Sequence, residues 1–118
     1  MAVKPTLFGI ANCDTVKRAR AWLAAQGIEP HFHDFKKAGL DAALLDAWLA
    51  DVPWQQLLNR RGTTWRKLDA NEQDSIVDAA SAKALMLARS SVVKRPVVRW
   101  VDGVTVGFDA EDWQQRIS

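Results

Sequence analysis

The sequence predicts an α/β domain that spans residues 1–118 and is built on a mixed four-stranded β-sheet. A strand, a helix and a strand follow one another within residues 7–35, and this spacing makes the two strands parallel. Residues 96–118 carry a second signal, an antiparallel hairpin followed by a helix. A helical insertion at about residues 37–90 separates the two. The expected order is therefore β-α-β, a block of helices, then β-β-α, with helices covering the sheet.

The first strand leads through a tight turn into a helix. Residues 7–10 form an apolar run that is too short for a helix, and residues 11–12 make the turn. Asp14 opens a helix that is expected to run to about Gln26, and Gly27 provides a left-handed stop. Apolar residues at helical spacing identify its buried face: Val16, Ala19 and Leu23.

The second strand is expected at residues 28–35, with Pro30 near its start. His31 and His33 are two positions apart, so they would share one face of that strand. Two histidines could ligate a metal, but no third ligand occurs at a recognisable spacing. We therefore expect no metal site.

The middle of the chain, residues 36–89, is helical in pattern. Its tryptophans fall at helical spacing beside leucines, so we expect them in the core. The loop at residues 59–64 is polar and basic. The expected helical segments, in chain order, are one capped by Asp41, one that begins at Pro53, a turn at residues 65–68, one at residues 71–80, and one from Ser81 to Ala88.

The end of the chain returns to strand. Residues 96–101 and 104–106 flank Asp102 and Gly103, and this dipeptide between β-branched runs predicts a hairpin turn in which both residues have positive φ. Asp109 then caps a final helix. The resulting order of elements is the layout of the thioredoxin-like fold, which places a nucleophile at the N-terminus of its first helix.

Composition limits the possible partners and location. The net charge of +2 is too small to argue for a nucleic-acid partner. A single cysteine cannot form an internal disulfide, which fits a reducing compartment. No apolar stretch approaches the length of a membrane span, and no leader-like segment begins the chain. We expect a cytoplasmic protein that binds neither nucleic acid nor a membrane.

Cys13 is expected at the start of the first helix, where unpaired backbone N–H groups meet the positive end of the helix dipole. Both favour the thiolate, which is the nucleophilic form of the side chain. Lys17 is four residues on, lies on the same helical face and could add a cation. Two alternatives stay open: Cys13 as a small buried hydrophobe, and Lys17 as a surface partner of Asp14.

Three segments resemble the ArsC/Spx family, and most closely its YffB-like branch of glutathione-dependent thiol reductases. They are Gly-Ile-Ala-Asn-Cys-Asp-Thr at residues 9–15, Arg61 after the helix with Leu57 and Leu58, and Lys-Arg-Pro-Val-Val at residues 94–98. The resemblance covers nearly the whole chain in order. It implies a thioredoxin-like domain and a thiol-dependent oxidoreductase.

The resemblance also implies roles for residues. Cys13 matches the catalytic cysteine, Arg95 the arginine that binds an oxyanion, and Pro96 a cis-proline. Arg61 matches a basic residue of the mid-chain loop, although Arg60 is adjacent and the register leaves the choice open. Without the family, both arginines could be solvated loop residues, and Arg95 could pair with a nearby carboxylate. The expected substrate-binding residues are Asn12, Lys17, Arg61, Arg95 and Pro96.

The sequence also departs from the family pattern. Val16 stands where arsenate reductases carry a serine and where Spx-type regulators carry the second cysteine of Cys-x-x-Cys. Arsenate reductases carry a further arginine in the part of the family pattern that matches the end of the hairpin, and residues 106–108 here contain none. This argues against arsenate as the substrate. We expect no bound cofactor, with glutathione as reductant or co-substrate and a small thiol or oxyanion as its partner in the reaction. The alternative is a non-enzymatic regulator that binds a protein partner, as Spx-like members do on RNA polymerase.

Overall fold

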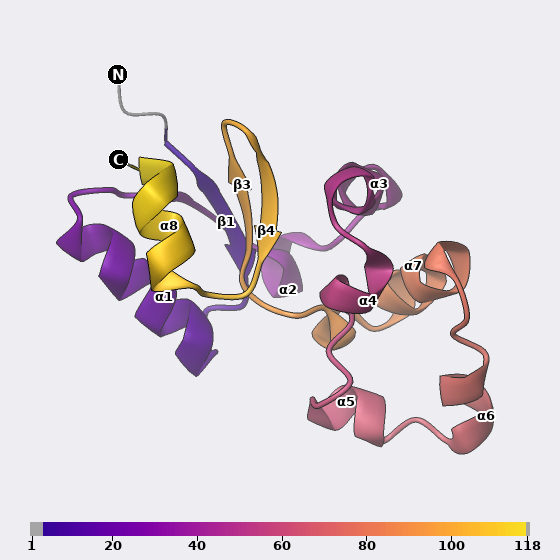
Figure 1. Cartoon of the computed structure of the whole chain (residues 1–118). Coiled ribbons are helices and arrows are strands. Elements are labelled where there is room, and N and C mark those ends of the chain that lie inside the picture. The colour runs from indigo at the N-terminus through magenta and orange to yellow at the C-terminus, as the bar shows by residue number, and fades with distance from the viewer. Residues whose placement is uncertain (1–3, 118) are drawn as a thin grey trace. The chain divides into compact units, whose positions relative to one another are not determined.

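The computed structural model describes residues 4–117, so the outermost residues of the expected domain, 1–3 and 118, lie outside the described part. The chain divides into two compact units (Figure 1). The first joins the N-terminal segment up to Ala38 with the C-terminal segment from Arg95 onward. The second is the continuous segment Gly39–Lys94, nearly the same residues as the expected helical insertion.

The first unit is a mixed four-stranded sheet with helices, as expected. The strand order is β2-β1-β3-β4. β1 pairs with β2 in parallel, and with β3 in the antiparallel sense, while β3 and β4 form the hairpin. In chain order the elements are β1 (Thr6–Gly9), α1 (Asp14–Ala25), β2 (His31–Asp34), α2 (Phe35–Ala38), β3 (Val97–Trp100), β4 (Gly103–Val106) and α8 (Ala110–Ile117).

α1 forms as its sequence predicts. Val16, Ala19 and Leu23 are its buried residues, which confirms the apolar stripe. Gly27 follows the helix with a φ of +76°, a conformation that residues with a Cβ rarely adopt. The helix therefore ends where the glycine redirects the chain toward β2.

One hydrophobic cluster of the first unit lies on the face of the sheet that is covered by α1 and α8. Leu7 of β1 pairs with Val98 of β3, so both side chains point to the same face, and both are fully buried. α1 and α8 cover this face side by side (Figure 1). Trp113 of α8 is completely buried, with ring centroids 5.2 Å from Trp100 of β3 and 6.0 Å from Trp22 of α1. These edge-to-face contacts join both helices to the sheet.

β1 and α1 lie very close together at Gly9. A Cβ on Gly9 would lie 2.8 Å from Cγ2 of Val16, closer than such atoms pack in proteins. Glycine is therefore required here by the short distance between strand and helix. Since Gly9 ends β1 and Val16 lies in the first turn of α1, this contact also limits the path of the loop that carries Cys13.

The second strand is shorter than the expected 28–35: it begins three residues later, at His31, and it ends one residue earlier because Asp34 starts a helix. Its Oδ1 accepts hydrogen bonds from the backbone N–H groups of Lys36 (3.0 Å) and Lys37 (3.3 Å). Phe35, expected to end the strand, is instead the first residue of α2 and is buried.

The hairpin is confirmed, but its expected turn is wrong by one residue. Trp100 pairs with Gly103, so the loop consists of Val101 and Asp102. Of the two residues expected at positive φ, only Gly103 has it, at +147°. The Asp102 carboxylate instead pairs with Arg116 of α8 at 3.1 Å, which connects the loop to the last helix.

The second unit is helical, and Asp41 caps its first helix as expected, accepting from the N–H of Leu44 at 2.8 Å. Pro53 precedes the second helix as its N-cap rather than forming its first residue. The elements are α3 (Ala42–Asp51), α4 (Trp54–Leu57), α5 (Thr63–Arg66), α6 (Ala70–Asp74), α7 (Ala79–Ala88) and the 3₁₀ helix η1 (Ser90–Val92).

The prediction of one helix at residues 71–80 is wrong. α6 stops at Asp74 and α7 begins at Ala79, and between them Asp78 has an extended backbone (φ −153°, ψ 177°) and caps α7. Its Oδ1 accepts the backbone N–H of Ser81 at 2.8 Å, and the Ser81 hydroxyl accepts the N–H of Asp78 at 3.1 Å. Ser81, expected to be the cap, is thus the third residue of a capping box.

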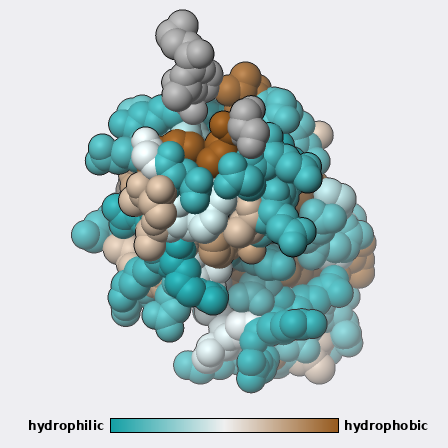
Figure 2. Space-filling view, turned by 60° about the vertical axis from the view of Figure 1, so that its left-hand side comes forward, coloured by the Kyte–Doolittle hydropathy of each residue, from teal (hydrophilic) through white to brown (hydrophobic). Residues whose placement is uncertain are grey.

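The surface is mostly hydrophilic. Figure 2 shows one face on which charged and polar residues prevail, with hydrophobic residues scattered between them. Among the described residues, the large hydrophobic side chains that are exposed are single ones: Val77, Leu87 and Val101. No helix within residues 4–117 has the length and hydropathy needed to cross a bilayer.

Replacing Gly9 by alanine is expected to lower the free energy of unfolding by about 1–3 kcal/mol, the usual penalty for overpacking a core. Denaturant unfolding of Gly9→Ala, Val16→Ala and the double variant gives a double-mutant cycle. The penalty for alanine at position 9 should shrink in the Val16→Ala background, because the opposing Cγ2 is gone. An equal penalty in both backgrounds would show that this contact does not limit the approach of α1.

The capping box predicts a pH-dependent stability. The pKa of Asp78 lies below its ordinary value because Ser81 donates hydrogen bonds from its backbone N–H and hydroxyl. A lowered pKa means that the cap stabilises the fold above the usual aspartate pKa, about 3.9, and loses that contribution as the pH falls through this value and below. Asp78→Ala should therefore lower the Tm more near pH 7 than near pH 2.5. Asp74→Ala, an exposed aspartate outside the box, is the control, and an equal loss for Asp78→Ala at both pH values would contradict the assignment.

Candidate active site

Two segments that are distant in sequence lie at the same end of the central strands of the sheet in the first unit. Phe8 of β1 pairs with Val97 of β3 in the antiparallel sense. The loop that follows β1 and the residues that precede β3 therefore lie at the same end of these strands. Cys13 belongs to that loop, and Arg95 and Pro96 are the residues before β3. The Arg95–Pro96 peptide bond is cis, as the family resemblance implied.

Cys13 is the N-cap of α1. Its backbone is extended (φ −141°, ψ 123°), and its carbonyl accepts the N–H of Lys17 at 2.9 Å, the first bond of the helix. The thiol makes no capping hydrogen bond. It is half-buried and packs against the core that contains Leu7 and Val16. The sulfur is thus held beside the first turn of a 12-residue helix, whose free N–H groups and dipole favour negative charge.

Asp34 steadies the loop before the cysteine, and the sequence analysis missed it. Gly9 pairs with Asp34 in the parallel register of β1 and β2, so the carboxylate lies beside the end of β1. Its Oδ2 accepts a long hydrogen bond of 3.4 Å from the N–H of Ala11. Its Oδ1 bonds to α2, as described above. An aspartate before a short helical pattern is a capping signal, but its contact with the loop depends on strand register.

Arg95 and Pro96 are partly enclosed by the end of the hairpin. Pro96 is buried, and its carbonyl accepts the N–H of Gly107 at 2.8 Å. Arg95 is half-buried, and its Nε atom is shielded from solvent. The start of β3 is therefore fixed against the residues that follow β4, which restricts where the Arg95 side chain can go.

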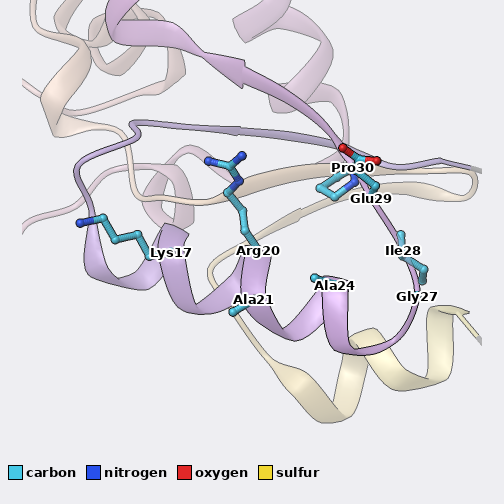
Figure 3. Close-up of a pocket in the computed structure, with 8 residues that line it drawn as sticks. All are labelled: Lys17, Arg20, Ala21, Ala24, Gly27, Ile28, Glu29 and Pro30. Carbon is cyan, nitrogen blue, oxygen red and sulfur yellow. The ribbon is translucent and has the colours of Figure 1, made fainter.

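Lys17 and Asn12 are exposed on either side of Cys13 in the sequence. Lys17 forms no ion pair with any side chain among residues 4–117, so the alternative of a pair with Asp14 is not observed. Its side chain instead lines one end of a pocket of about 610 Å³ that runs along α1 (Figure 3).

Arg60 and Arg61 belong to the second unit, and their surroundings differ. The guanidinium of Arg60 lies over the rings of Trp54 and Trp65, with 5.5 Å and 5.8 Å to the ring centroids. The side chain of Arg61 is exposed, while its N–H donates to Asn59 Oδ1 at 3.1 Å. The carbonyl of Arg61 accepts two hydrogen bonds from the guanidinium of Arg66. The backbone of Arg61 is thus fixed, and its role toward a substrate stays a prediction.

The histidines do not assemble a ligand set. His31 is exposed, and the ring of His33 lies 5.2 Å from that of Phe8. No three His, Cys, Asp or Glu side chains within the described part of the chain group as metal ligands would.

Comparison with known proteins gives the family. The ArsC family model matches residues 8–116. An uncharacterised protein of Haemophilus influenzae is 37% identical over 109 residues, which cover 92% of this chain and 95% of that protein.

Two solved structures are similar over nearly their whole length. A YffB protein is 41% identical with a TM-score of 0.91, covering 98% of this chain and 100% of that one. An arsenate reductase (ArsC) related protein from Brucella melitensis is 51% identical with a TM-score of 0.78, covering 98% and 95%. Sheet topology, family model and relatives agree: the chain belongs to the ArsC family and has the thioredoxin-like fold.

Proposed function

We propose that this protein is a glutathione-dependent thiol oxidoreductase in which Cys13 is the nucleophile. The observation that carries the proposal is the position of the thiol: half-buried at the N-cap of α1 and not used in capping. A thiolate at that position is stabilised by the helix N-terminus and remains within reach of a substrate. Membership of the ArsC family supports thiol-based redox chemistry.

In the first step the Cys13 thiolate attacks the glutathione sulfur of a mixed disulfide between glutathione and a second thiol. An S–S bond forms between Cys13 and glutathione as the original disulfide breaks. The second thiol leaves with the electron pair as a thiolate and takes up a proton from water. The substrate thiol has then been reduced, and the enzyme holds glutathione as a mixed disulfide.

An external thiol must complete the cycle, because the chain has one cysteine. A second glutathione thiolate attacks the glutathione sulfur of the mixed disulfide and releases oxidised glutathione and the Cys13 thiolate. The sum is the reduction of one mixed disulfide at the expense of two glutathione molecules, one of which was already bound to the substrate. We place this exchange in the reducing cytoplasm, where thiols are kept available.

The cations beside the thiol suit glutathione, which carries two carboxylates. Arg95, at the same end of the sheet as Cys13, offers a planar fork for one carboxylate, and Lys17 offers a point charge one helical turn away. Asn12 adds a polar side chain next to the thiol, and the backbone beside Pro96 can pair with the extended peptide of glutathione. Arg61 remains a candidate for anion binding from the family resemblance. Without the serine and the further arginine of arsenate reductases, arsenate is the weaker substrate candidate.

Cys13→Ser should abolish turnover of a glutathione mixed disulfide, because serine lacks a nucleophile that can form the intermediate. In the wild type, intact mass spectrometry should show one added glutathione after a single turnover without reductant. Alkylation of Cys13 should be faster near pH 6 than that of free glutathione under the same conditions, and saturating glutathione disulfide should protect it.

Full turnover in Cys13→Ser would refute the mechanism. Slow alkylation without protection, together with co-purification of a large protein partner, would instead favour the regulatory binding module. That outcome would leave the fold assignment intact, since the family and the topology do not depend on the reactivity of Cys13.

Arg95→Ala should raise the KM for glutathione about tenfold or more, the cost of losing one charge-assisted hydrogen bond. The KM of Arg95→Lys should fall between those of the wild type and Arg95→Ala, because lysine keeps the charge but cannot form two parallel hydrogen bonds with a carboxylate. Arg99→Ala is the matched control: an exposed arginine on the same strand, paired across the sheet with Thr6. Equal KM values in Arg95→Ala and Arg99→Ala would remove Arg95 from the glutathione site.

A further inference from the structure

A pocket of about 610 Å³ lies along α1 and the segment that joins it to β2. Its volume is in the range of sites that bind small ligands or short peptide segments. Ala21 and Ala24 of α1 line one side, and Pro30 contributes to the opposite side (Figure 3). The small side chains leave room above the helix, and the apolar lining can take the main chain and methylene groups of a ligand.

Three charged side chains surround this pocket, and they have no ion-pair partners among residues 4–117. Lys17 extends beside the first turn of α1, Arg20 rises from the helix toward the sheet, and Glu29 lies at the opposite end (Figure 3). The Arg20 guanidinium is held in place by the ring of Phe32, 4.2 Å from its centroid. The pocket is therefore cationic at the end near the start of α1 and anionic at the other.

The pocket begins at Lys17, one helical turn after Cys13. Cys13, Lys17, Ala21 and Ala24 follow at spacings of four, four and three residues, which keeps them on one face. With a rise of about 1.5 Å per residue, Arg20 is about 10 Å and Ala24 about 16 Å along the axis from Cys13. These lengths correspond to about three and five residues of an extended peptide. Glutathione bound through its sulfur at Cys13 is too short to reach Glu29.

We propose that this pocket binds the peptide segment that flanks the reactive cysteine of a protein substrate. The preferred segment carries an acidic side chain about three residues from that cysteine, beside Arg20, and a basic one about five residues from it, beside Glu29. This inference rests on the proposed function and extends it, since it assigns the substrate class to protein thiols linked to glutathione. The charges select among substrates and need not take part in the sulfur exchange.

The first test compares glutathionylated nine-residue peptides. One has the acidic and basic positions described, another has the charges inverted, and each is made in both chain directions. Wild type should turn over the preferred pattern with a kcat/KM about fivefold higher, as expected for a few exposed ion pairs, and added salt should reduce the difference. The double variant Arg20→Glu/Glu29→Lys should reverse the preference, and Glu29→Lys alone should weaken it.

Two controls separate charge recognition from general damage. Arg18→Glu makes the same charge change at an exposed position off the pocket face of α1, and should keep the wild-type preference. Turnover of the small mixed disulfide of glutathione and 2-mercaptoethanol should be unchanged in Arg20→Glu/Glu29→Lys, since the residues proposed to hold glutathione, Arg95 and Lys17, are both kept. Equal kcat/KM for both peptides in wild type, or a preference that survives the charge exchange, would overturn the proposal.

A binding experiment distinguishes failure of the pocket from failure of the chemistry. The same peptides with serine in place of cysteine are titrated into ¹⁵N-labelled Cys13→Ser protein, which cannot exchange disulfides. The preferred peptide should shift the amide signals of Ala21, Ala24 and Gly27 at lower concentration than the inverted peptide. Shifts there without turnover in the wild type would uphold the pocket and refute the proposed function. Turnover in the wild type without these shifts would uphold the function and refute the pocket.

Discussion

The contact between Gly9 and Val16 decides where the first helix can lie. Because Gly9 has no side chain, α1 can pack closely against the end of β1, which places its N-cap at that end of the sheet. Arg95 and Pro96 lie at the same end of the sheet because β1 and β3 are antiparallel. The placement of the Cys13 loop and of the Arg95–Pro96 segment at the same end of the sheet thus depends on a packing distance in the core as well as on strand register.

The parts of the fold with a regular hydrophobic period could be predicted from the sequence. The stripe of Val16, Ala19 and Leu23 identified α1, and the β-branched runs identified the hairpin. Errors arose where two local signals competed. Ser81 and Asp78 are both good caps, and only their reciprocal bonding shows which one ends the non-helical segment. The hairpin turn moved by one residue because Gly103 already pairs with Trp100, leaving Val101 and Asp102 to make the loop.

For the candidate site too, local features could be predicted from the sequence, whereas contacts that depend on tertiary structure could not. Cys13 at a helix N-terminus is a local feature, and a strand-turn-helix pattern suffices to find it. The link from Asp34 to Ala11 depends on the register of two strands, which the sequence does not specify residue by residue. The environments of Arg60 and Arg61 could not be predicted from the sequence either, because side chains of neighbouring loop residues point in different directions. Arg60 stacks on indole rings, whereas the Arg61 side chain is exposed.

The strand order has a consequence for how the chain acquires its structure during synthesis. β1 is a central strand, yet one of its two partners, β3, is near the other end of the chain, and Thr6 pairs with Arg99. The continuous segment Gly39–Lys94 has its own compact set of contacts and leaves the ribosome before β3 does. Long-range pairing of this kind slows folding, and until it occurs one edge of β1 stays open to pairing with other chains. Completion of the sheet, and with it the placement of the Arg95–Pro96 segment beside the end of β1, must therefore wait for the last quarter of the polypeptide.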